Sequence, residues 1–297
     1  MRNTRLQLLA VFCLGLPTAG LAQEAGTEEP EMVDRIWDLG VGIGFGDQSN
    51  PFVGADDVST YVTLDLAIYG ERFFFDNGEL GFTWIDQPGF GLNVLTTYSS
   101  DRVYYSYFND LALVRTSSVQ GGPLDSLEVL PVDVVGEGGT DPAPPGVFSL
   151  LNLPDRSFAV NLGLEAVWDM PNGQVQWQVL QDVSNTHQGT QMDVGFSHTW
   201  AKGKWAFQPR VGVSWKSAQL VDYYYGLDNQ SSLFRLRYEG ADAININMGF
   251  LLSYRISNKL SYVNQFSYTQ LDQEIHQSPL IDTDHTRSFF SGLYYRF

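Results

Sequence analysis

The stretch that decides the fold is residues 204–216, with the sequence Lys-Trp-Ala-Phe-Gln-Pro-Arg-Val-Gly-Val-Ser-Trp-Lys. Large apolar side chains recur at alternate positions, and polar residues such as Gln208 and Arg210 stand between them. This period of two is typical of a β-strand, whose successive side chains point to opposite faces. Trp205 and Trp215 mark the two ends of the apolar face. Aromatic residues at both ends of such a face are typical of a strand that crosses a lipid bilayer.

The same alternation recurs along the chain and predicts about twelve strands, with about ten as the alternative. They lie near 36–46, 58–69, 72–85, 89–99, 102–114, 157–169, 174–183, 190–201, 204–216, 241–256, 259–272 and 285–297. The only way for strands to satisfy their backbone in lipid is a closed barrel. We therefore expect an all-β fold: a single transmembrane antiparallel up-and-down β-barrel of the outer-membrane type.

Two positions disturb this pattern. Pro209 has no N–H to donate to a ladder, so we expect a bulge there or a place at the rim of the sheet. Within 72–85 the apolar residues change phase at Asn77-Gly78, a pair that favours a hairpin turn. A turn there would leave strands shorter than the roughly 9–11 residues of a transmembrane strand. The sequence therefore favours a bulge that shifts the register within 72–85 by one residue.

The connections between the predicted strands alternate in length. Tight links are expected at Gly70-Glu71, Ser100-Asp101, Pro171-Asn172-Gly173, Lys202-Gly203 and Ser257-Asn258, longer ones at 47–57, 115–156, 217–240 and 273–283, and shorter ones at 86–88 and 184–189. Outer-membrane barrels have short periplasmic turns and longer external loops. This rule places both ends of the barrel segment on the periplasmic side and makes 115–156 a long external loop.

The first residues have the pattern of a secretory signal peptide. Arg2 and Arg5 precede an apolar run at 6–16, and small residues lead to Ala22, after which we expect cleavage. The apolar run of about 11 residues is too short to span a bilayer. The expected organisation is a signal peptide at 1–22, an acidic periplasmic tail at 23–35 and an outer-membrane barrel at 36–297.

Composition argues against several classes of function. The chain has 17 basic and 34 acidic residues and a formal net charge of -17, whereas nucleic-acid binding needs a basic face against the phosphates. The four histidines, His187, His198, His276 and His285, lack the spacing of a zinc site. No catalytic motif stands out either, so we expect no enzymatic activity, no cofactor and no metal.

A hydrolase embedded in the membrane is the enzyme class that the sequence leaves as an alternative. Asp182, Ser184 and His187 follow one another in an expected external loop and have the residue types of a hydrolytic triad. Three residues within one turn rarely converge in that way, and no nucleophile elbow accompanies them. The sequence favours a hydrogen-bonded turn at these positions.

The run Tyr223, Tyr224 and Tyr225 is a second candidate contact site. Flat aromatic faces can bind sugars or lipid headgroups, although the sequence favours an interfacial belt or a packed loop top. We expect Gly226 to permit a turn with positive φ.

Charged residues are also predicted on the inner face of the strands. They are Asp65, Glu165, Asp193, Arg210, Lys216, Arg255 and Arg296. Such residues either line a conduit or form a salt-bridged plug, and a barrel of this size is compatible with both.

The end of the chain carries a further signal. Phe289, Leu293, Tyr295 and Phe297 occupy alternate positions. A C-terminal phenylalanine with this alternation resembles the insertion signature that the barrel-assembly machinery recognises. We therefore expect that machinery as a partner during insertion, outer-membrane lipid as the surroundings, and the cell outer membrane as the location.

Several motifs together resemble the MipA/OmpV family, the MltA-interacting outer-membrane proteins. They are Asp38-Leu-Gly-Val-Gly-Ile-Gly44, Tyr69-Gly-Glu-Arg-Phe-Phe-Phe-Asp-Asn-Gly-Glu-Leu-Gly-Phe82, Gln181-Asp-Val-Ser-Asn-Thr-His-Gln-Gly189, Tyr223-Tyr-Tyr-Gly-Leu227 and Gly292-Leu-Tyr-Tyr-Arg-Phe297. The resemblance implies an outer-membrane barrel that acts as a scaffold and links a lytic transglycosylase to a murein synthase at the periplasmic face. A narrow porin-like channel and a surface adhesin or antigen are the alternatives.

Overall fold

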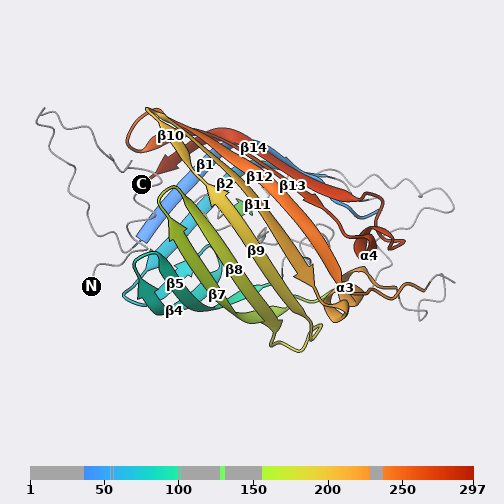
Figure 1. Ribbon diagram of the computed structural model, residues 1–297. Coiled ribbons are helices and arrows are strands. Elements are labelled where there is room, and N and C mark those ends of the chain that lie inside the picture. Colours follow the sequence, from blue (N-terminus) through green and yellow to red (C-terminus); the bar gives the residue numbers. More distant parts are fainter. Residues whose placement is uncertain are drawn as a thin grey trace, which may run out of the picture.

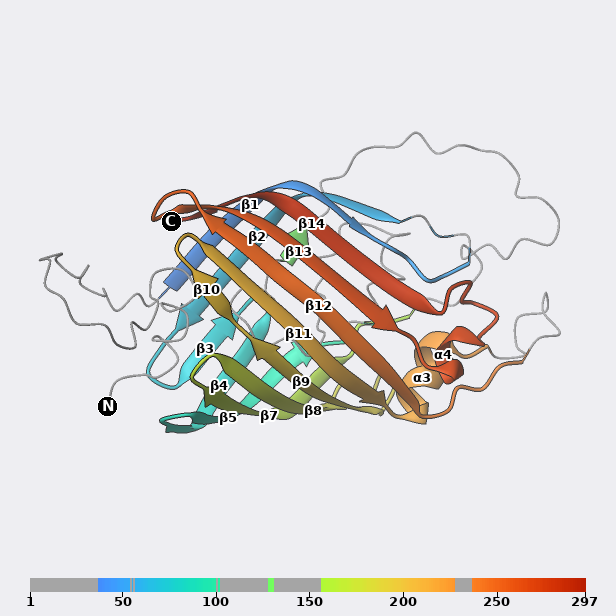
Figure 2. The same cartoon turned by 45° about the horizontal axis from the view of Figure 1, so that its top comes forward.

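The computed structural model describes residues 37–53, 55, 57–99, 101, 128–130, 156–227 and 237–297. These residues form one antiparallel sheet that curls into a barrel of strongly tilted strands (Figures 1 and 2). The predicted signal peptide, the acidic tail and most of the predicted loop 115–156 lie outside the described residues.

The sheet contains fourteen strands. They are β1 (Trp37–Gln48), β2 (Val58–Tyr69), β3 (Phe73–Asp76), β4 (Glu79–Gln87), β5 (Phe90–Tyr98), β6 (Glu128–Leu130), β7 (Val160–Met170), β8 (Gly173–Asp182), β9 (Thr190–His198), β10 (Trp200–Lys202), β11 (Trp205–Lys216), β12 (Ala243–Arg255), β13 (Leu260–Gln270) and β14 (His285–Arg296). Because β10 continues β9 and β6 is attached to β2, twelve strands form the closed ring. The barrel closes where β1 pairs with both β2 and β14. The prediction of an antiparallel barrel of about twelve strands is confirmed.

Strand β11 shows how the alternation of the sequence builds the wall. Trp205 and Val211 are 51% and 56% exposed, whereas Gln208 and Arg210 between them are only 7% and 8% exposed. Apolar side chains therefore face outward and polar ones face the lumen, as in a barrel surrounded by lipid. The outer face of the barrel also carries exposed aromatic residues near both ends of its strands, which are Trp37, Phe73, Trp84, Trp168, Trp200 and Trp205 near one end and Phe45, Tyr61, Tyr98 and Phe158 near the other.

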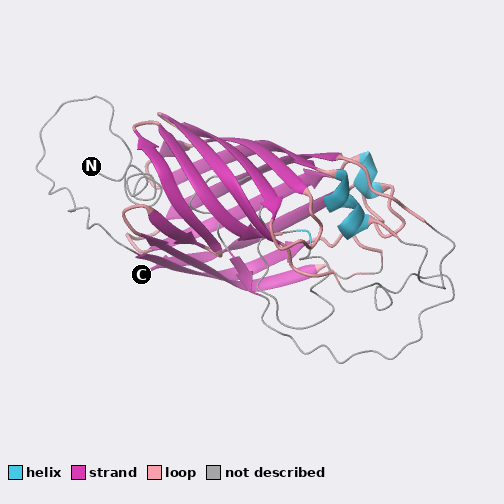
Figure 3. Ribbon diagram, turned by 90° about the horizontal axis from the view of Figure 1, so that it is seen from below, coloured by secondary structure: helices cyan, strands magenta, loops and turns pink. Residues whose placement is uncertain are grey.

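The two ends of the barrel differ in their connections. At the end where β1 begins and β14 ends, the links are short and comprise 70–72, 88–89, 171–172, 203–204 and 256–259. We call this the turn end. The opposite end, the loop end, carries α3 (Ala218–Tyr225) and α4 (Gln273–His276) (Figure 3). In the part of the chain that the structure describes, no helix is long and apolar enough to cross a membrane.

The prediction of a bulge in place of a turn at Asn77-Gly78 is wrong, because this segment folds into a hairpin. A register shift does occur within 72–85, but it lies between Thr83 and Ile85, where β4 pairs with β5. Strands β3 and β4 pair antiparallel, with Asp76 opposite Glu79. Asn77 has φ 42° and Gly78 has φ 92°, and two successive residues with positive φ are typical of a type I′ turn. The phase of the apolar residues changes because the chain reverses direction here.

This hairpin changes the direction of the strands that follow it. Strand β5 ends at the loop end and pairs directly with β7, from Phe90 opposite Trp168 to Tyr98 opposite Val160. The link at 86–88 therefore belongs to the turn end. Asp101 was predicted to lie in a turn-end link, but it follows β5 at the loop end. The strand predicted at 102–114 lies outside the described residues.

The tip of the hairpin is tied to the middle of β2. The Asn77 N–H donates to the carbonyl of Leu66 at 2.9 Å, and the Asn77 Oδ1 accepts from the N–H of Leu66 at 2.8 Å. The Asn77 Nδ2 donates to Asp65 at 2.9 Å. Beyond the tip, β6 pairs with β2 at Val62–Leu64. The edge of β2 is thus shared between a short hairpin and a short added strand.

The bulge expected at Pro209 is also absent. Phe207 pairs with Trp200 of β10, and Arg210 pairs with Ser197 of β9, which is the same register on both sides of the proline. The missing N–H of Pro209 accounts for the break between β9 and β10 without a shift of register.

The seam between β1 and β14 is narrow. A Cβ atom added to Gly44 would lie 2.5 Å from the Cα of Gly292, so the two backbones approach closely only because both residues are glycine. At the turn end, the Arg296 guanidinium donates to both carboxylate oxygens of Asp38, at 2.6 and 2.5 Å. This bidentate pair locks the last strand to the first.

Candidate functional sites at the two ends of the barrel

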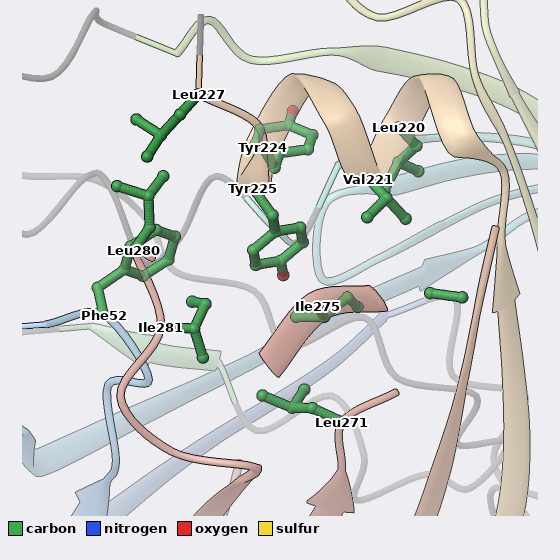
Figure 4. Packing of buried hydrophobic residues seen from close by; sticks show 11 residues of the cluster. Phe52, Leu220, Val221, Tyr224, Tyr225, Leu227, Leu271, Ile275, Leu280 and Ile281 are labelled. Atoms are coloured by element: carbon green, nitrogen blue, oxygen red, sulfur yellow. The ribbon is translucent and has the colours of Figure 1, made fainter. Parts of the chain in front are cut away.

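An apolar core caps the loop end of the barrel. It joins α3, α4 and the segments before β2 and β14, and its buried members are Phe52, Leu220, Val221, Tyr224, Tyr225, Leu227, Ala243, Leu271, Ile275, Leu280 and Ile281 (Figure 4). We call this cluster the cap. Leu220, Val221, Tyr224 and Tyr225 follow the spacing of an amphipathic helix, which explains why this part of a connection folds as α3.

A buried ion pair lies beneath the cap. The Lys216 Nζ is 2.5 Å from Asp101 Oδ1, and both side chains are buried. The hydroxyl of Tyr225 donates to the same carboxylate oxygen at 2.7 Å. The chain just after β5, the end of β11 and helix α3 are therefore joined through one carboxylate. A buried charge needs such a partner, because desolvation alone is costly.

The tyrosine run is part of this cap. Tyr224 and Tyr225 are buried, and Tyr223 packs against the cap. The Tyr223 hydroxyl accepts from the Ser157 N–H at 2.9 Å. Binding of sugars or lipid headgroups by these residues stays a prediction.

The expectation of positive φ at Gly226 is wrong. Gly226 has φ −76°, and its N–H donates to the Asp222 carbonyl at the end of α3. A glycine is needed at this position because there is no room for a side chain: an added Cβ would lie 2.2 Å from the Asp222 carbonyl oxygen.

Asp182 organises the loop between β8 and β9. One of its carboxylate oxygens accepts from the N–H of Ser184 at 2.8 Å and from its hydroxyl at 2.6 Å. The other accepts from the N–H groups of His187 and Gln188, at 2.7 and 2.8 Å. The serine hydroxyl is directed to the carboxylate and not to the histidine, which is the geometry of a turn and not of a nucleophile paired with its base.

His187 is enclosed between this loop and the cap. Its Nδ1 accepts from the N–H of Gly189 at 2.9 Å and lies 4.0 Å from Asp182 Oδ2. Its ring lies against those of Tyr223 and Tyr224. Burial lowers the pKa of His187, which favours the neutral ring. Any contact role of Asp182, Ser184 and His187 stays a prediction.

Side chains on the inner face of the barrel are largely buried, and several are hydrogen-bonded to one another. Asp65 accepts from the Tyr294 hydroxyl at 2.6 Å, and Glu165 accepts from Asn93 and from Gln176. Apolar side chains also turn inward, in one cluster of Phe74, Leu95 and Leu180 and another of Leu251, Val263, Phe290 and Tyr294. Of the charged residues predicted to face the lumen, Asp65, Glu165, Asp193, Arg210 and Lys216 are buried, Arg296 pairs with Asp38, and Arg255 lies half-buried at the turn end.

Charge is divided between two arcs of the turn end. The basic arc consists of Lys202, Lys204, Arg255 and Lys259, on the two neighbouring turns that join β10 to β11 and β12 to β13. The acidic arc consists of Glu71, Asp86 and Asp169, with Arg72 among them, at the ends of β2, β4 and β7. This division was not predicted from the sequence, because the link at 86–88 was expected at the opposite end.

The C-terminal pattern lies on the outer face of the barrel. Phe289, Leu293, Tyr295 and Phe297 are all exposed to the outside, and β14 pairs with β1 and β13 along this stretch. The hydroxyls of Ser291, which interrupts the apolar pattern, and Tyr262 of β13 are hydrogen-bonded at 2.7 Å. Recognition of these residues by the assembly machinery stays a prediction.

The pair of Asp101 and Lys216 was not predicted either, because the two residues are 115 positions apart in the chain. Within the described ranges, no three His, Cys, Asp or Glu side chains come together as a possible metal site.

Comparisons with known proteins find similar chains among curated proteins and solved structures. The chain is 26% identical over 136 residues to the outer membrane protein Omp26La of Vibrio anguillarum, covering 46% of this chain and 53% of the relative. It is 25% identical over 154 residues to the MltA-interacting protein of Escherichia coli K12, covering 51% of this chain and 62% of the relative. The match thus spans between half and two thirds of the length of these relatives.

Among solved structures, the chain is similar to the NanC porin, with a TM-score of 0.40 and 10% identity over 87% of this chain and 98% of that one. The family model of the MltA-interacting protein MipA matches residues 39–297, nearly the whole described barrel. The chain therefore belongs to the MltA-interacting protein MipA family and is located in the outer membrane.

Proposed function

We propose that this barrel is a non-enzymatic scaffold that holds murein-remodelling enzymes at its turn end. The observation that carries the proposal is the burial of the inner face of the barrel wall. Polar and charged side chains on this face are largely buried, and the cap packs at the loop end. In a water-filled channel, inward polar groups are solvated. A barrel with a buried inner face and a capped loop end is better suited to contact with partners than to a wide passage.

The turn end is the surface that faces murein. Short turns are periplasmic in outer-membrane barrels, and murein lies in the periplasm. The partner class comes from the name of the relative, an MltA-interacting protein. By resemblance to the family, the partners are a lytic transglycosylase and a murein synthase.

Two acidic features of the chain supply a docking surface at this end. The acidic arc lies on the rim, and the tail 23–35, which includes Glu24, Glu28, Glu29 and Glu31, directly precedes β1. Complementary charge steers and orients a partner more than it adds raw affinity. We therefore expect the bound enzyme to present a basic face.

Co-purification from detergent tests this proposal. The full-length mature barrel should retain a lytic transglycosylase, and deletion of residues 23–35 should weaken the association and make it less sensitive to salt. A heat-dependent gel shift confirms that each variant is folded. Failure of the intact barrel to bind the enzyme, under conditions in which it is folded, would contradict the scaffold.

The channel alternative is tested in a planar bilayer. The burial of the inner face predicts no current steps of the size that open porins give. Regular conductance steps from the purified barrel would favour the channel over the scaffold.

The adhesin alternative depends on the segment 115–156. The structure describes only β6 and Arg156 of this segment, so the adhesin role stays a prediction. Loss of host-cell binding on deletion of residues within this loop would test it.

A further inference from the structure

The turn between β10 and β11 combines lysines with tryptophans on the outside of the barrel. Lys202 is paired with Trp205 across the ladder, and cross-strand partners lie on the same face of a sheet. Trp200 and Trp205 are both exposed outward. The Lys202 side chain therefore begins on the lipid-facing side of the wall, at the level of the aromatic belt.

Lys204 is directed to the same side. Its Nζ lies 5.9 Å from the ring centroid of Tyr254, which packs against Trp205 with ring centroids 4.7 Å apart. This geometry brings an ammonium group over an aromatic face. Gly203, with φ 62°, makes the turn between the two lysines tight.

The neighbouring turn adds more positive charge. The Arg255 N–H donates to the Lys204 carbonyl at 2.8 Å, so the two turns touch, and Lys259 is exposed in the second turn. The segments 198–216 and 243–263 contain no aspartate or glutamate. In a chain of net charge -17, the basic arc has the opposite sign to the molecule as a whole.

The acidic arc shows that the aromatic belt alone does not account for these lysines. The belt continues there with Trp84 and Trp168, but the charges beside it are Asp86 and Asp169. The belt is thus common to both arcs, and the sign of the charge distinguishes them.

We propose that Lys202 and Lys204 of the basic arc bind the headgroup of an anionic phospholipid in the periplasmic leaflet of the membrane. Lys202 and Lys204 attract the phosphate, and the rings of Trp200, Trp205 and Tyr254 lie against the glycerol and the first methylene groups, at the depth where such rings are favoured. Each basic residue close to an anionic lipid surface raises the affinity by about fivefold. This site is separate from the proposed docking of murein enzymes and does not depend on it.

Quenching of tryptophan fluorescence by brominated lipids tests the site. The full-length barrel is reconstituted in nanodiscs of phosphatidylethanolamine that contain a small fraction of brominated phosphatidylglycerol. We expect the wild-type barrel to concentrate the anionic lipid beside Trp200 and Trp205. The double variant Lys202→Gln with Lys204→Gln should lower the affinity for phosphatidylglycerol by about 30-fold, as two charges are lost. Quenching by brominated phosphatidylethanolamine should not change.

Three controls make the result decisive. Arg72→Gln removes a basic residue from the acidic arc and should leave the binding of phosphatidylglycerol unchanged. Lys202→Arg with Lys204→Arg keeps the charges and should keep the binding. In the wild-type barrel, the preference for phosphatidylglycerol should fall as ionic strength rises, because exposed charges are screened.

Equal affinity in the Gln variant and the wild type would overturn the proposal. So would a Gln variant that keeps its lipid binding but no longer retains a lytic transglycosylase, because the basic arc would then bind an acidic protein. A loss of enzyme binding on deletion of 23–35, with lipid binding intact, would support the proposed scaffold and would leave the proposed lipid site standing.

Discussion

The loop end and the turn end of this barrel use their side chains differently. At the loop end, eleven residues are buried in the cap, and the charges of Asp101 and Lys216 are buried beneath it. At the turn end, aromatic and basic residues such as Trp200, Lys202 and Lys204 remain exposed. The difference indicates that side chains stabilise the fold at one end and are left available for contact at the other.

The largest expected effect comes from breaking the buried ion pair. Asp101→Ala leaves the ammonium of Lys216 buried without this carboxylate, and we expect the loop end to lose about 3–5 kcal/mol of stability. Hydrogen exchange of the amides in α3 measures the loss. The matched double variant Asp101→Leu with Lys216→Met should regain much of the stability, because the buried carboxylate and the buried ammonium are removed together. Unchanged exchange in the single variant would contradict a stabilising role of the pair.

Truncation within the cap should have the next largest effect. Leu220→Ala removes a buried side chain that packs among the other residues of the cap, and we expect a cost of about 2–5 kcal/mol at this end. Limited proteolysis should then cut within 217–242 while the heat-dependent gel shift of the barrel is retained. If cleavage and gel shift change together, the cap and the wall unfold as one unit.

Two asparagines in tight turns should differ in their contribution to stability. Asn77→Ala removes the side chain that joins the β3–β4 turn to β2 and places alanine at positive φ, so we expect a loss of about 1–3 kcal/mol. Asn172→Ala, in the exposed turn between β7 and β8, should change stability by less than about 0.5 kcal/mol. Urea unfolding in lipid vesicles measures both, and equal losses would remove the distinction.

The loop end should also respond to pH through His187. Burial lowers its pKa from the usual 6.5, and Lys216 acts in the same direction, whereas Asp182 and Asp101 oppose the shift. The opened loop has the ordinary pKa and takes up a proton more readily than the packed one. Stability contributed by the neutral ring is therefore complete above the ordinary value and falls as the pH drops through it towards the lowered pKa.

Hydrogen exchange in the loop between β8 and β9 measures this dependence at pH values of about 7.5 and about 5.5, which bracket the ordinary pKa of histidine. Exchange, corrected for its intrinsic pH dependence, should be less protected at the lower pH. His187→Asn, which offers a non-titrating acceptor, should reduce the difference. A difference of the same size in the variant would assign the pH response to other groups.

The smallest effect is expected at the basic arc. Lys202→Gln with Lys204→Gln should change the unfolding free energy by no more than about 0.5 kcal/mol for each substitution, because both side chains are exposed and lie away from the buried networks. Urea unfolding checks this expectation. A large loss would mean that the turn end also contributes to the stability of the fold.

The strands of the barrel wall were predictable where the alternation of lipid-facing and lumen-facing residues is the main constraint on the sequence. In β11 and β12 each residue either faces lipid or the lumen, and the alternation in the sequence specifies both strands and their faces. The β3–β4 hairpin was missed because a rule on strand length was applied before the signal of Asn77-Gly78. The four-residue β3 is possible only because β2 also pairs with Asn77 and with β6, which are contacts that local sequence does not report.

The candidate sites were predictable only in part. The apolar stripe of Leu220, Val221, Tyr224 and Tyr225 was a readable signal for α3, although the tyrosine run drew attention to surface binding instead. The pair of Asp101 and Lys216 was not readable, since it depends on where the chain lies after β5. The lysines of the turn end were visible, but their isolation from acidic residues appears only once the direction of β4 and β5 is known.

The narrow seam between β1 and β14 has a consequence for how the protein reaches the membrane. The pair of Asp38 and Arg296 joins residues 258 positions apart, so it belongs to the slowest class of contacts to form. Until the two strands meet, each presents a row of unpaired peptide groups, which hydrocarbon does not tolerate. Completion of the cylinder and its entry into the bilayer must therefore proceed together, and any substitution that widens the approach of Gly44 to Gly292 should delay both.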